Sequence, residues 1–280
     1  MKSKVLILLL GIVLIHTFVS GCVEESEKKA QPRDGDEKIF SEKSIEGIYN
    51  PVIESGKVYI NGNWHNYTLI RYKKDGIDYK TAYLDHVIHP FDWLKNNTEK
   101  DSTILCWWDY GGMIEGYSER EAIAVYPPLS LLDTIGMYNE FDKQGKERYV
   151  SEHDFSEEEK IKEIALFLTA ENFSNESVQN IIEKYNVSYI FTRSYDKKLA
   201  GIFLYAAVKD LSNYFIDCEE KGHYCYGGTP TDLANQTLIY KMWADEPQIP
   251  GLILRYSNTI SGSNDPDINT NIVRIFSIEN

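Results

Sequence analysis

Hydrophobic and polar residues alternate between residues 50 and 85 in a pattern that predicts a small antiparallel sheet. Asn61-Gly62 lies between two apolar runs and is a typical two-residue turn of a β-hairpin. The run that follows, residues 67–72, leads to a second turn at Asp75-Gly76, and residues 79–84 resume the pattern. We therefore expect strands joined by tight turns in this part of the chain.

From residue 90 onward, segments with helical periodicity alternate with short apolar segments that are typical of strands. The capping box from Ser156 to Glu159 marks the start of one amphipathic helix. The predicted helices cover residues 91–95, 156–170, 175–185 and 199–214, and the predicted strands cover residues 102–107, 122–126, 189–192, 237–243, 252–256 and 272–278. This alternation predicts a mixed α/β (α+β) domain in which helices pack on a mixed sheet.

The first 21 residues have the pattern of an export signal. Lys2 and Lys4 precede an apolar run over residues 5–19. The run ends in Val-Ser-Gly-Cys, which resembles the lipobox of secreted lipoproteins, in which the cysteine, here Cys22, is lipidated. An uncleaved signal anchor is the alternative. Both interpretations place the rest of the chain at the outer face of the cytoplasmic membrane, and the first attaches it to the lipid bilayer through Cys22.

These patterns predict four segments. Residues 1–21 are a lipoprotein signal peptide, residues 22–45 a charged tether, residues 46–88 a small β region and residues 89–280 the α/β domain. The tether is rich in charged residues and poor in apolar ones, so it cannot bury enough surface to fold alone.

The overall charge of the chain limits its partners. Asp and Glu number 43 against 29 Lys and Arg, which gives a net charge of −14. Such a surface repels a phosphate backbone, so nucleic acid is not expected as a partner. A hydrophobic content of 42% over 280 residues is sufficient for a sizeable core.

Two residue clusters have the right chemistry for a metal ion but the wrong setting. His86 and His89 would share a helix face, but Pro90 disfavours helix there and no third ligand is evident. Residues 265–269 alternate oxygen-bearing side chains as a calcium loop does, yet they lack its central glycine and distal glutamate, so a turn is expected. We predict no metal site and no cofactor in this chain.

The remaining cysteines and the Asn-x-Ser/Thr triplets also depend on export. Cys218 and Cys225 lie close together in a predicted loop, where an exported protein typically forms a disulfide, with a zinc site that includes His223 as the alternative. Cys106 is then an unpaired, small buried hydrophobe. Six triplets are candidate glycosylation sites, at Asn66, Asn96, Asn172, Asn175, Asn186 and Asn235.

Trp107-Trp108-Asp109-Tyr110-Gly111 is the most distinctive stretch of the chain. Each tryptophan must bury a large ring and find a partner for its indole N–H, and an aspartate among aromatic rings needs hydrogen-bond donors. One interpretation is a strand end whose aromatic rings fill the core while Asp109 caps a turn. The other is a binding site, and the residues themselves leave both open.

The same five residues match the WWDYG signature of the oligosaccharyltransferase catalytic subunit, the membrane enzyme of asparagine-linked protein glycosylation. Stretches on both sides also resemble this family, whose archaeal members are the most similar. These stretches are residues 91–105, 112–114, 181–190, 238–243 and 273–276. The resemblance covers residues 90–280 and implies the α/β fold of the enzyme's soluble domain.

The resemblance also implies a site. In the family, the two tryptophans and the aspartate form a pocket that hydrogen-bonds the Ser or Thr hydroxyl of an acceptor peptide, so Trp107, Trp108 and Asp109 are assigned to peptide binding. Ile202 is assigned to the contact with the threonine methyl group. It keeps the family's four-residue step from Lys198, although Asp196 stands one residue closer than the family's spacing requires.

The family's catalytic residues and metal ligands lie in a multi-span membrane domain that has no counterpart in this sequence. We therefore expect a membrane-anchored homologue that binds Asn-x-Ser/Thr peptides and has no activity of its own. One alternative is the acceptor-binding subunit of a split glycosyltransferase, whose separate membrane subunit would supply any divalent metal. The other is a structural cell-surface lipoprotein with both indoles buried and Asp109 held by internal donors.

Overall fold

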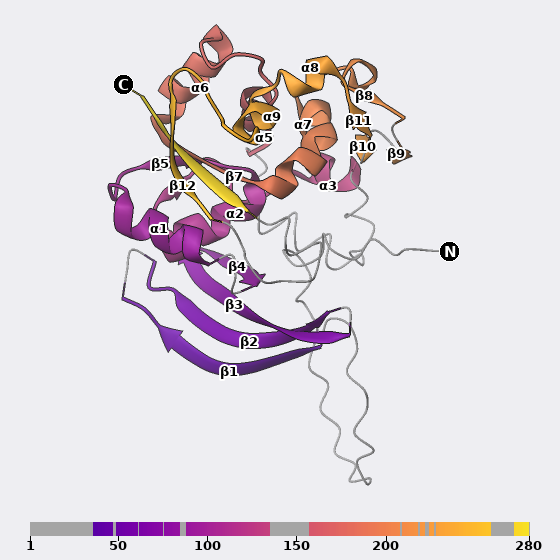
Figure 1. Ribbon diagram of the computed structural model, residues 1–280. Helices are drawn as coiled ribbons and strands as arrows, with labels where there is room; N and C mark the ends of the chain where they lie inside the picture. The colour runs from indigo at the N-terminus through magenta and orange to yellow at the C-terminus, as the bar shows by residue number, and fades with distance from the viewer. Residues whose placement is uncertain are drawn as a thin grey trace. The chain divides into compact units, whose positions relative to one another are not determined.

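The computed structural model describes residues 36–46, 49–60, 62–74, 76–84, 88–134, 157–207, 209–217, 219–221, 224–226, 228–258 and 272–279. The chain divides into two compact units, Met1–Ile88 and His89–Asn280 (Figure 1). The predicted signal peptide lies outside the described residues. Within the described ranges, no helix has both the length and the apolar character needed to cross a membrane.

The first unit contains an antiparallel sheet with the strand order β1-β2-β3-β4. Its strands are β1 (Glu37–Ser44), β2 (Val52–Ile60), β3 (Asn63–Lys74) and β4 (Ile77–Leu84). Ile60 pairs with Asn63, and Gly62 between them has a φ of 83°, a left-handed value that favours glycine. The predicted antiparallel sheet is thus confirmed.

Strand β1 lies inside the segment that the sequence predicts to be a tether. Nearly all of its side chains are exposed, including Ile39 and Phe40. Because neither face of the strand is buried, its sequence needs no alternation of apolar and polar residues. The strand forms because its backbone pairs with β2 at the edge of the sheet, a position that tolerates charged residues. Arg71 of β3 strengthens this edge by hydrogen bonds to Glu42 of β1 and to the buried Glu54 of β2.

The second unit contains a mixed sheet with the strand order β12-β13-β7-β5-β6. Its strands are β5 (Thr103–Leu105), β6 (Glu121–Ala122), β7 (Val187–Arg193), β12 (Leu252–Ser257) and β13 (Val273–Ile278). Strand β5 runs parallel to β6 and β7, whereas β13 runs antiparallel to β7 and β12. The predicted mixed α+β class is confirmed.

Helices cover both faces of this sheet, and Figure 1 shows α1 and α2 on one side with α5, α6 and α7 on the other. The helices are α1 (His89–Asn97), α2 (Trp108–Met113), the π-helix η3 (Ile114–Ser118), α3 (Leu129–Thr134), α5 (Glu157–Leu168), α6 (Glu176–Tyr185), α7 (Ala200–Ala206), α8 (Asp232–Asn235), α9 (Leu238–Met242) and the 3₁₀ helices η5 (Ser194–Leu199) and η6 (Leu211–Asn213). Two short ladders complete the unit, β8 (Phe215–Ile216) with β11 (Thr229–Pro230) and β9 (Glu219–Lys221) with β10 (Tyr224–Tyr226).

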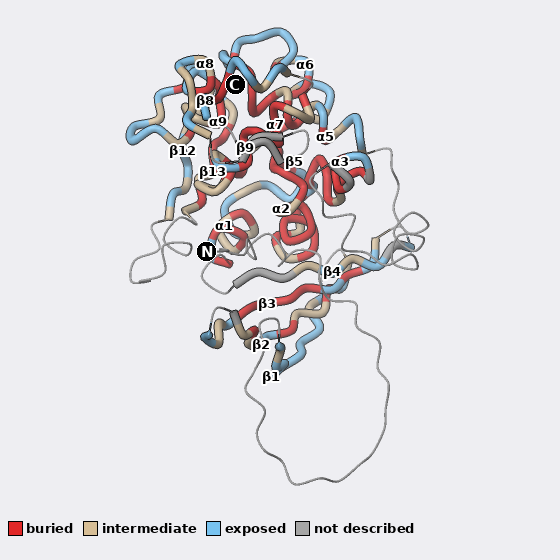
Figure 2. Tube along the Cα trace, turned by 90° about the vertical axis from the view of Figure 1, so that its right-hand side faces the viewer, coloured by how far each residue is buried: buried red, intermediate tan, exposed pale blue. Residues whose placement is uncertain are grey.

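The core of the second unit lies where these helices meet the sheet. Strand β5 is buried throughout, and Ile190, Phe191 and Phe276 of the neighbouring strands are fully buried (Figure 2). Phe191 stacks on Phe91 of α1, with ring centroids 5.2 Å apart. Because β5 ends inside this core, the residues that follow it, Trp107 and Trp108, begin in a buried environment.

Two predicted elements of the second unit are wrong. Residues 237–243, predicted as a strand, contain helix α9, in which Leu238, Ile239 and Met242 share the buried face. A five-residue helix is too short to show its period in the sequence, so the apolar run suggests a strand. The predicted helix over 199–214 instead begins at the end of η5 and is broken between α7 and η6. At this break, the Asp210 carboxylate accepts from the Ser212 N–H, a local hydrogen bond that competes with the helix.

Candidate functional site

The site predicted from the sequence lies where β5 ends and α2 begins. Trp107 has extended backbone and precedes α2, so Trp108 and Asp109 occupy the first turn of that helix. The chain then passes directly into the π-helix η3, whose end at Glu119 is left-handed with a φ of 57°. A π-helical turn is rare and frequently marks a functional site, which makes the α2–η3 segment a candidate.

The three residues assigned to peptide binding differ in exposure. Trp107 is 3% exposed and its ring lies 4.5 Å, centroid to centroid, from that of Phe203. Trp108 is 9% exposed, and its buried indole N–H has no hydrogen-bond partner among the described residues. Asp109 is partly exposed, although its carboxylate oxygen Oδ1 is buried. Trp107 therefore packs as a core residue, while Trp108 and Asp109 provide the polar groups of the site.

Helix α7 lies against this segment. Ile202, the residue assigned to the threonine methyl contact, is 4% exposed in α7, and the next residue, Phe203, contacts Trp107. The structure thus brings the helix that carries Ile202 into contact with Trp107.

A buried polar cluster that the sequence does not predict lies beside Asp109. The hydroxyl of Tyr110 donates to Asp196 Oδ1 at 2.5 Å, and the Arg193 backbone N–H donates to Asp196 Oδ2 at 2.8 Å. The Arg193 guanidinium lies 5.4 Å from the centre of the Tyr110 ring. Asp196, which the sequence places one residue too close to Ile202, is in the structure bound to the motif through Tyr110. The one signal of this cluster in the sequence is the tyrosine of the motif. The spacing of residues along the chain cannot identify its partner.

Two carboxyl groups compete for one guanidinium in this cluster. Burial raises the pKa of Asp109 to about 7, with a further increase from the charge of Asp196 and a partial offset from Arg193. Burial also raises the pKa of Asp196 to about 6, against which the hydrogen bond from Tyr110 acts. Asp109 therefore changes its protonation near neutral pH. Its carboxyl group can donate a hydrogen bond when protonated and only accept one when ionised.

Gly111 of α2 and Glu157 of α5 both contact the backbone of residues 124–126. A Cβ atom on Gly111 would lie 2.2 Å from the Ala124 carbonyl oxygen, so only glycine allows α2 to approach this backbone. Glu157, at the start of α5, accepts hydrogen bonds from the N–H groups of Val125 and Tyr126 at 3.2 and 2.8 Å. These bonds occupy the donors that a longer strand would use, which explains why β6 ends at Ala122 although residues 122–126 are predicted as a strand.

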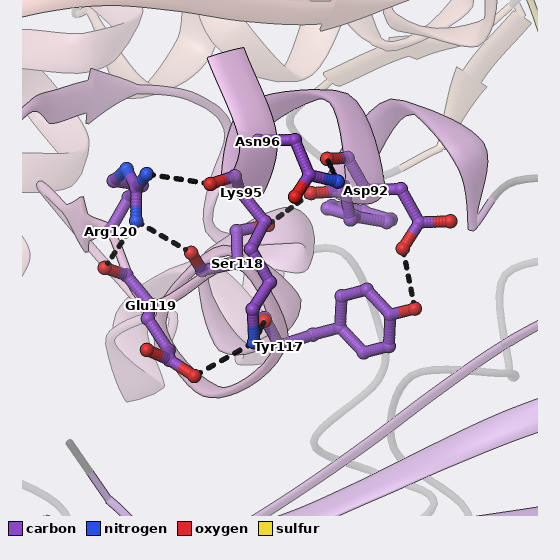
Figure 3. Close-up of polar contacts among 8 residues, drawn as sticks. Asp92, Lys95, Asn96, Tyr117, Ser118, Glu119 and Arg120 are labelled. Carbon is purple, nitrogen blue, oxygen red and sulfur yellow. Dashed lines mark hydrogen bonds and ion pairs between the residues drawn. The ribbon is translucent and has the colours of Figure 1, made fainter. Parts of the chain in front are cut away.

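The far end of η3 is bound to α1 through Arg120, as Figure 3 shows. Arg120 is 6% exposed. Its guanidinium donates to the carbonyl oxygens of Lys95, Thr98, Ser118 and Glu119 and to the Thr98 hydroxyl, at 2.6–3.1 Å. Because Lys95 and Thr98 lie at the end of α1, one buried side chain joins the last turn of α1 to the end of η3.

Three further contacts support this connection (Figure 3). The Lys95 ammonium lies 2.8 Å from Glu119 Oε1, the Tyr117 hydroxyl donates to Asp92 Oδ1 at 2.6 Å, and the Ser118 hydroxyl donates to the Phe91 carbonyl at 3.0 Å. We call Arg120 and these three pairs the α1–η3 contact. Since η3 continues α2, this contact fixes the segment that carries Trp108 and Asp109.

The other candidate residues lie elsewhere or outside the described ranges. Cys22, His86, Cys218 and residues 265–269 are outside the described residues, and the predicted disulfide with Cys225 falls with them. Where the structure is described, no group of three or more His, Cys, Asp or Glu residues could hold a metal ion. Cys106 is free and fully buried, as expected for a small hydrophobe.

The fold and the site together describe an α+β domain that presents a WWDYG motif at the start of a helix. No family model matches the chain. Two curated proteins match a short part of it: the dolichyl-diphosphooligosaccharide–protein glycosyltransferase subunit stt3 of Schizosaccharomyces pombe is 40% identical over 43 residues, and the corresponding subunit of Saccharomyces cerevisiae is 37% identical over 46 residues. The matches cover 15% and 16% of this chain and 6% of each relative.

Two solved structures are also similar to parts of the chain. The C-terminal globular domain of oligosaccharyltransferase from Archaeoglobus fulgidus is 18% identical, with 70% of this chain and 99% of that chain covered and a TM-score of 0.44. An oligosaccharyltransferase of the same organism, tethered to an acceptor peptide with the NVT sequon, is 17% identical, with a TM-score of 0.43. The match covers 64% of this chain and 24% of that chain. The two curated matches confirm the resemblance to this glycosyltransferase subunit that the sequence indicated.

Proposed function

We propose that this chain is a membrane-anchored, non-catalytic homologue of the oligosaccharyltransferase soluble domain that binds Asn-x-Ser/Thr peptides in protein N-glycosylation. Its matched relatives are glycosyltransferase subunits, and one similar structure holds an acceptor peptide with the NVT sequon. The chain spans 6% of the length of the curated relatives it matches, so the transfer reaction is not proposed for it.

The observation that carries this proposal is the buried indole N–H of Trp108. It has no acceptor among the described residues, and a buried donor without a partner costs about 1–3 kcal/mol. The partly exposed Asp109 is the next residue. A Ser or Thr hydroxyl could accept from the indole and donate to the carboxylate, whereas a methyl group could do neither. A site of this kind selects for the hydroxyl because an analogue without it leaves the buried Trp108 indole N–H without an acceptor.

The burial of the indoles sets the route of approach. Since Trp107 is packed against Phe203, the hydroxyl would enter beside the exposed part of Asp109 and reach the edge of Trp108. One hydroxyl gives little binding energy against the cost of ordering an extended peptide, so affinity for a single peptide should be weak.

Calorimetric titration of the full chain with Asn-Val-Thr and Asn-Val-Ala peptides tests the proposal. We expect the threonine peptide to bind more tightly. The W108F variant keeps an aromatic ring, although a smaller one, but removes the donor, so it should reduce the difference between the peptides. W93F is the matched control, because Trp93 is a partly exposed tryptophan in α1 whose ring contacts Tyr189 and Tyr256. Equal affinity for both peptides would refute peptide selection by the hydroxyl.

A second candidate function is a structural lipoprotein without a binding site, which the burial of both indoles favours. Absence of binding to either peptide would support it. Binding together with co-purification of a membrane glycosyltransferase would instead identify the chain as the acceptor subunit of a split enzyme. We further propose that Cys22 carries the lipid that holds the chain at the outer membrane face, and intact-mass measurement of the native protein would detect that lipid.

A further inference from the structure

The six Asn-x-Ser/Thr triplets of this chain are not equivalent once it is folded. A hydroxyl-reading enzyme needs both the asparagine amide and the Ser or Thr hydroxyl to be accessible, on a segment that is not held by strand pairing or by a helix cap. We infer that the triplet at Asn172 alone meets these conditions in the folded chain, and that Asn172 is its site of N-glycosylation after folding. This inference does not depend on whether the chain binds peptides itself.

Two triplets have their threonine hydroxyl bonded inside the protein. The Thr98 hydroxyl, two residues after Asn96, donates to the Leu94 carbonyl at 2.7 Å and accepts from the buried Arg120 at 2.8 Å. The Asn96 amide nitrogen itself donates to the Asp92 carbonyl (Figure 3). Thr237, two residues after Asn235, is 2% exposed, and its hydroxyl donates to Ala234 at 2.7 Å.

Two other triplets have their backbone within a sheet. Asn66 and Thr68 belong to β3, which is paired on one side with β2 and on the other with β4, and Thr68 is buried. Ser188, two residues after Asn186, belongs to β7, which lies between β5 and β13. Neither segment can be extended into an enzyme without breaking strand pairing.

The triplet at Asn175 is built into the start of α6. The Asn175 side-chain oxygen caps this helix by accepting from the Ser177 N–H at 3.0 Å. The Ser177 hydroxyl donates to the same oxygen at 2.9 Å. Using this triplet as an acceptor would require the first turn of α6 to unwind and the cap to be lost.

The triplet at Asn172 lies in the turn between α5 and α6, outside regular secondary structure. Asn172 and Ser174 are both exposed, and the described part of the chain contains no hydrogen bond to either side chain, while the Asn172 carbonyl accepts from the Asn175 N–H at 3.2 Å as part of the turn. Phe173 between them is buried against Phe167 with ring centroids 6.3 Å apart, so it anchors the turn while its neighbours remain open to solvent.

The chemistry of the transfer is that named for the matched relatives, with a dolichyl-diphosphooligosaccharide as donor. A bond forms between Asn172 Nδ2 and the sugar's anomeric carbon, and the bond from that carbon to the diphosphate oxygen breaks. Dolichyl diphosphate leaves, and Nδ2 loses one proton. The Oδ1 atom of the acceptor takes no part in the new bond.

The experiment compares the folded chain with short peptides. The full chain, made in a host without this pathway, and six synthetic peptides that each span one triplet are incubated with an oligosaccharyltransferase and dolichyl-diphosphooligosaccharide. Glycopeptide mapping then measures occupancy at each asparagine. We expect occupancy at Asn172 of the folded chain to exceed that at each other site by at least about tenfold, because the others need local unfolding. The N172Q and S174A variants should remove the modification, and S174T should retain it.

The peptides make the result decisive. If peptides around Asn96 and Asn235 accept the sugar while the folded chain does not accept it there, folding is shown to close those triplets. Comparable occupancy of the folded chain at any other triplet would overturn the inference. So would a folded chain left unmodified at Asn172, whether or not the Asn172 peptide is an acceptor.

Discussion

Replacement of Arg120 by methionine is the perturbation that most directly probes how the candidate site is held. The R120M variant keeps an unbranched apolar stem but removes the guanidinium. It thereby removes five hydrogen bonds, three to Lys95 and Thr98 at the end of α1 and two to the carbonyl oxygens of Ser118 and Glu119 at the end of η3. The acceptors stay in place and lose their donor.

The magnitude follows from how many of those acceptors water can reach. Lys95, Thr98 and Glu119 are partly exposed, so their oxygens can be hydrated, whereas Ser118 is fully buried. A buried acceptor without a donor costs about 1–3 kcal/mol, and a hydrated one costs little. Relief from burying the charge of Arg120 offsets part of this loss. We therefore expect R120M to lower the free energy of unfolding by about 3 kcal/mol, and R120K, which keeps fewer donors, by about half as much.

Urea unfolding of the full chain, followed by tryptophan fluorescence, measures this change. Trp93, Trp107, Trp108 and Trp243 belong to the second unit, so their signal reports on it. K95M is the matched control, because it removes the partly exposed ion pair with Glu119 and should cost about 1 kcal/mol or less. If R120M cost no more than K95M, Arg120 would not be the residue that joins η3 to α1.

Two further predictions concern the motif itself. The G111A variant gains about 1 kcal/mol of helix propensity but forces a Cβ atom to within 2.2 Å of the Ala124 oxygen. We therefore expect thermal or urea unfolding to show a net loss of about 2 kcal/mol in the free energy of unfolding. Unchanged stability would show that this backbone moves aside freely. The raised pKa values of Asp109 and Asp196 mean that the native state keeps protons which the unfolded chain releases, so unfolding free energy should fall as pH rises from about 4 to about 7. In the same titration, D109N should flatten this fall by roughly 2–4 kcal/mol, and a slope equal to that of the wild type would contradict the assignment.

The sequence predicts the elements whose physical signals are local. The turn at Gly62, the helical period of α6 and the apolar run of β7 are each encoded within a few residues. Strand β1 and helix α9 carry no such signal, since one is an exposed edge that only pairing with β2 orders and the other is shorter than two helical turns.

The candidate site divides in the same way. Its motif is visible in the sequence because Trp107, Trp108 and Asp109 are consecutive. Their surroundings are not visible, because the residues that complete them are far away in the chain. Asp196 lies 86 residues from its partner Tyr110, and Arg120 reaches back 25 residues to Lys95. Sequence spacing cannot identify partners that only the folded sheet brings together.

The most direct test of the central claim observes the indole N–H of Trp108 by nuclear magnetic resonance in the full, ¹⁵N-labelled chain. The W108F variant assigns this resonance among those of the five tryptophans. If a peptide hydroxyl accepts from this N–H, the resonance shifts on addition of an Asn-Val-Thr peptide and stays in place with Asn-Val-Ala. An unchanged Trp108 resonance at saturating Asn-Val-Thr, or the same shift with both peptides, would contradict the account.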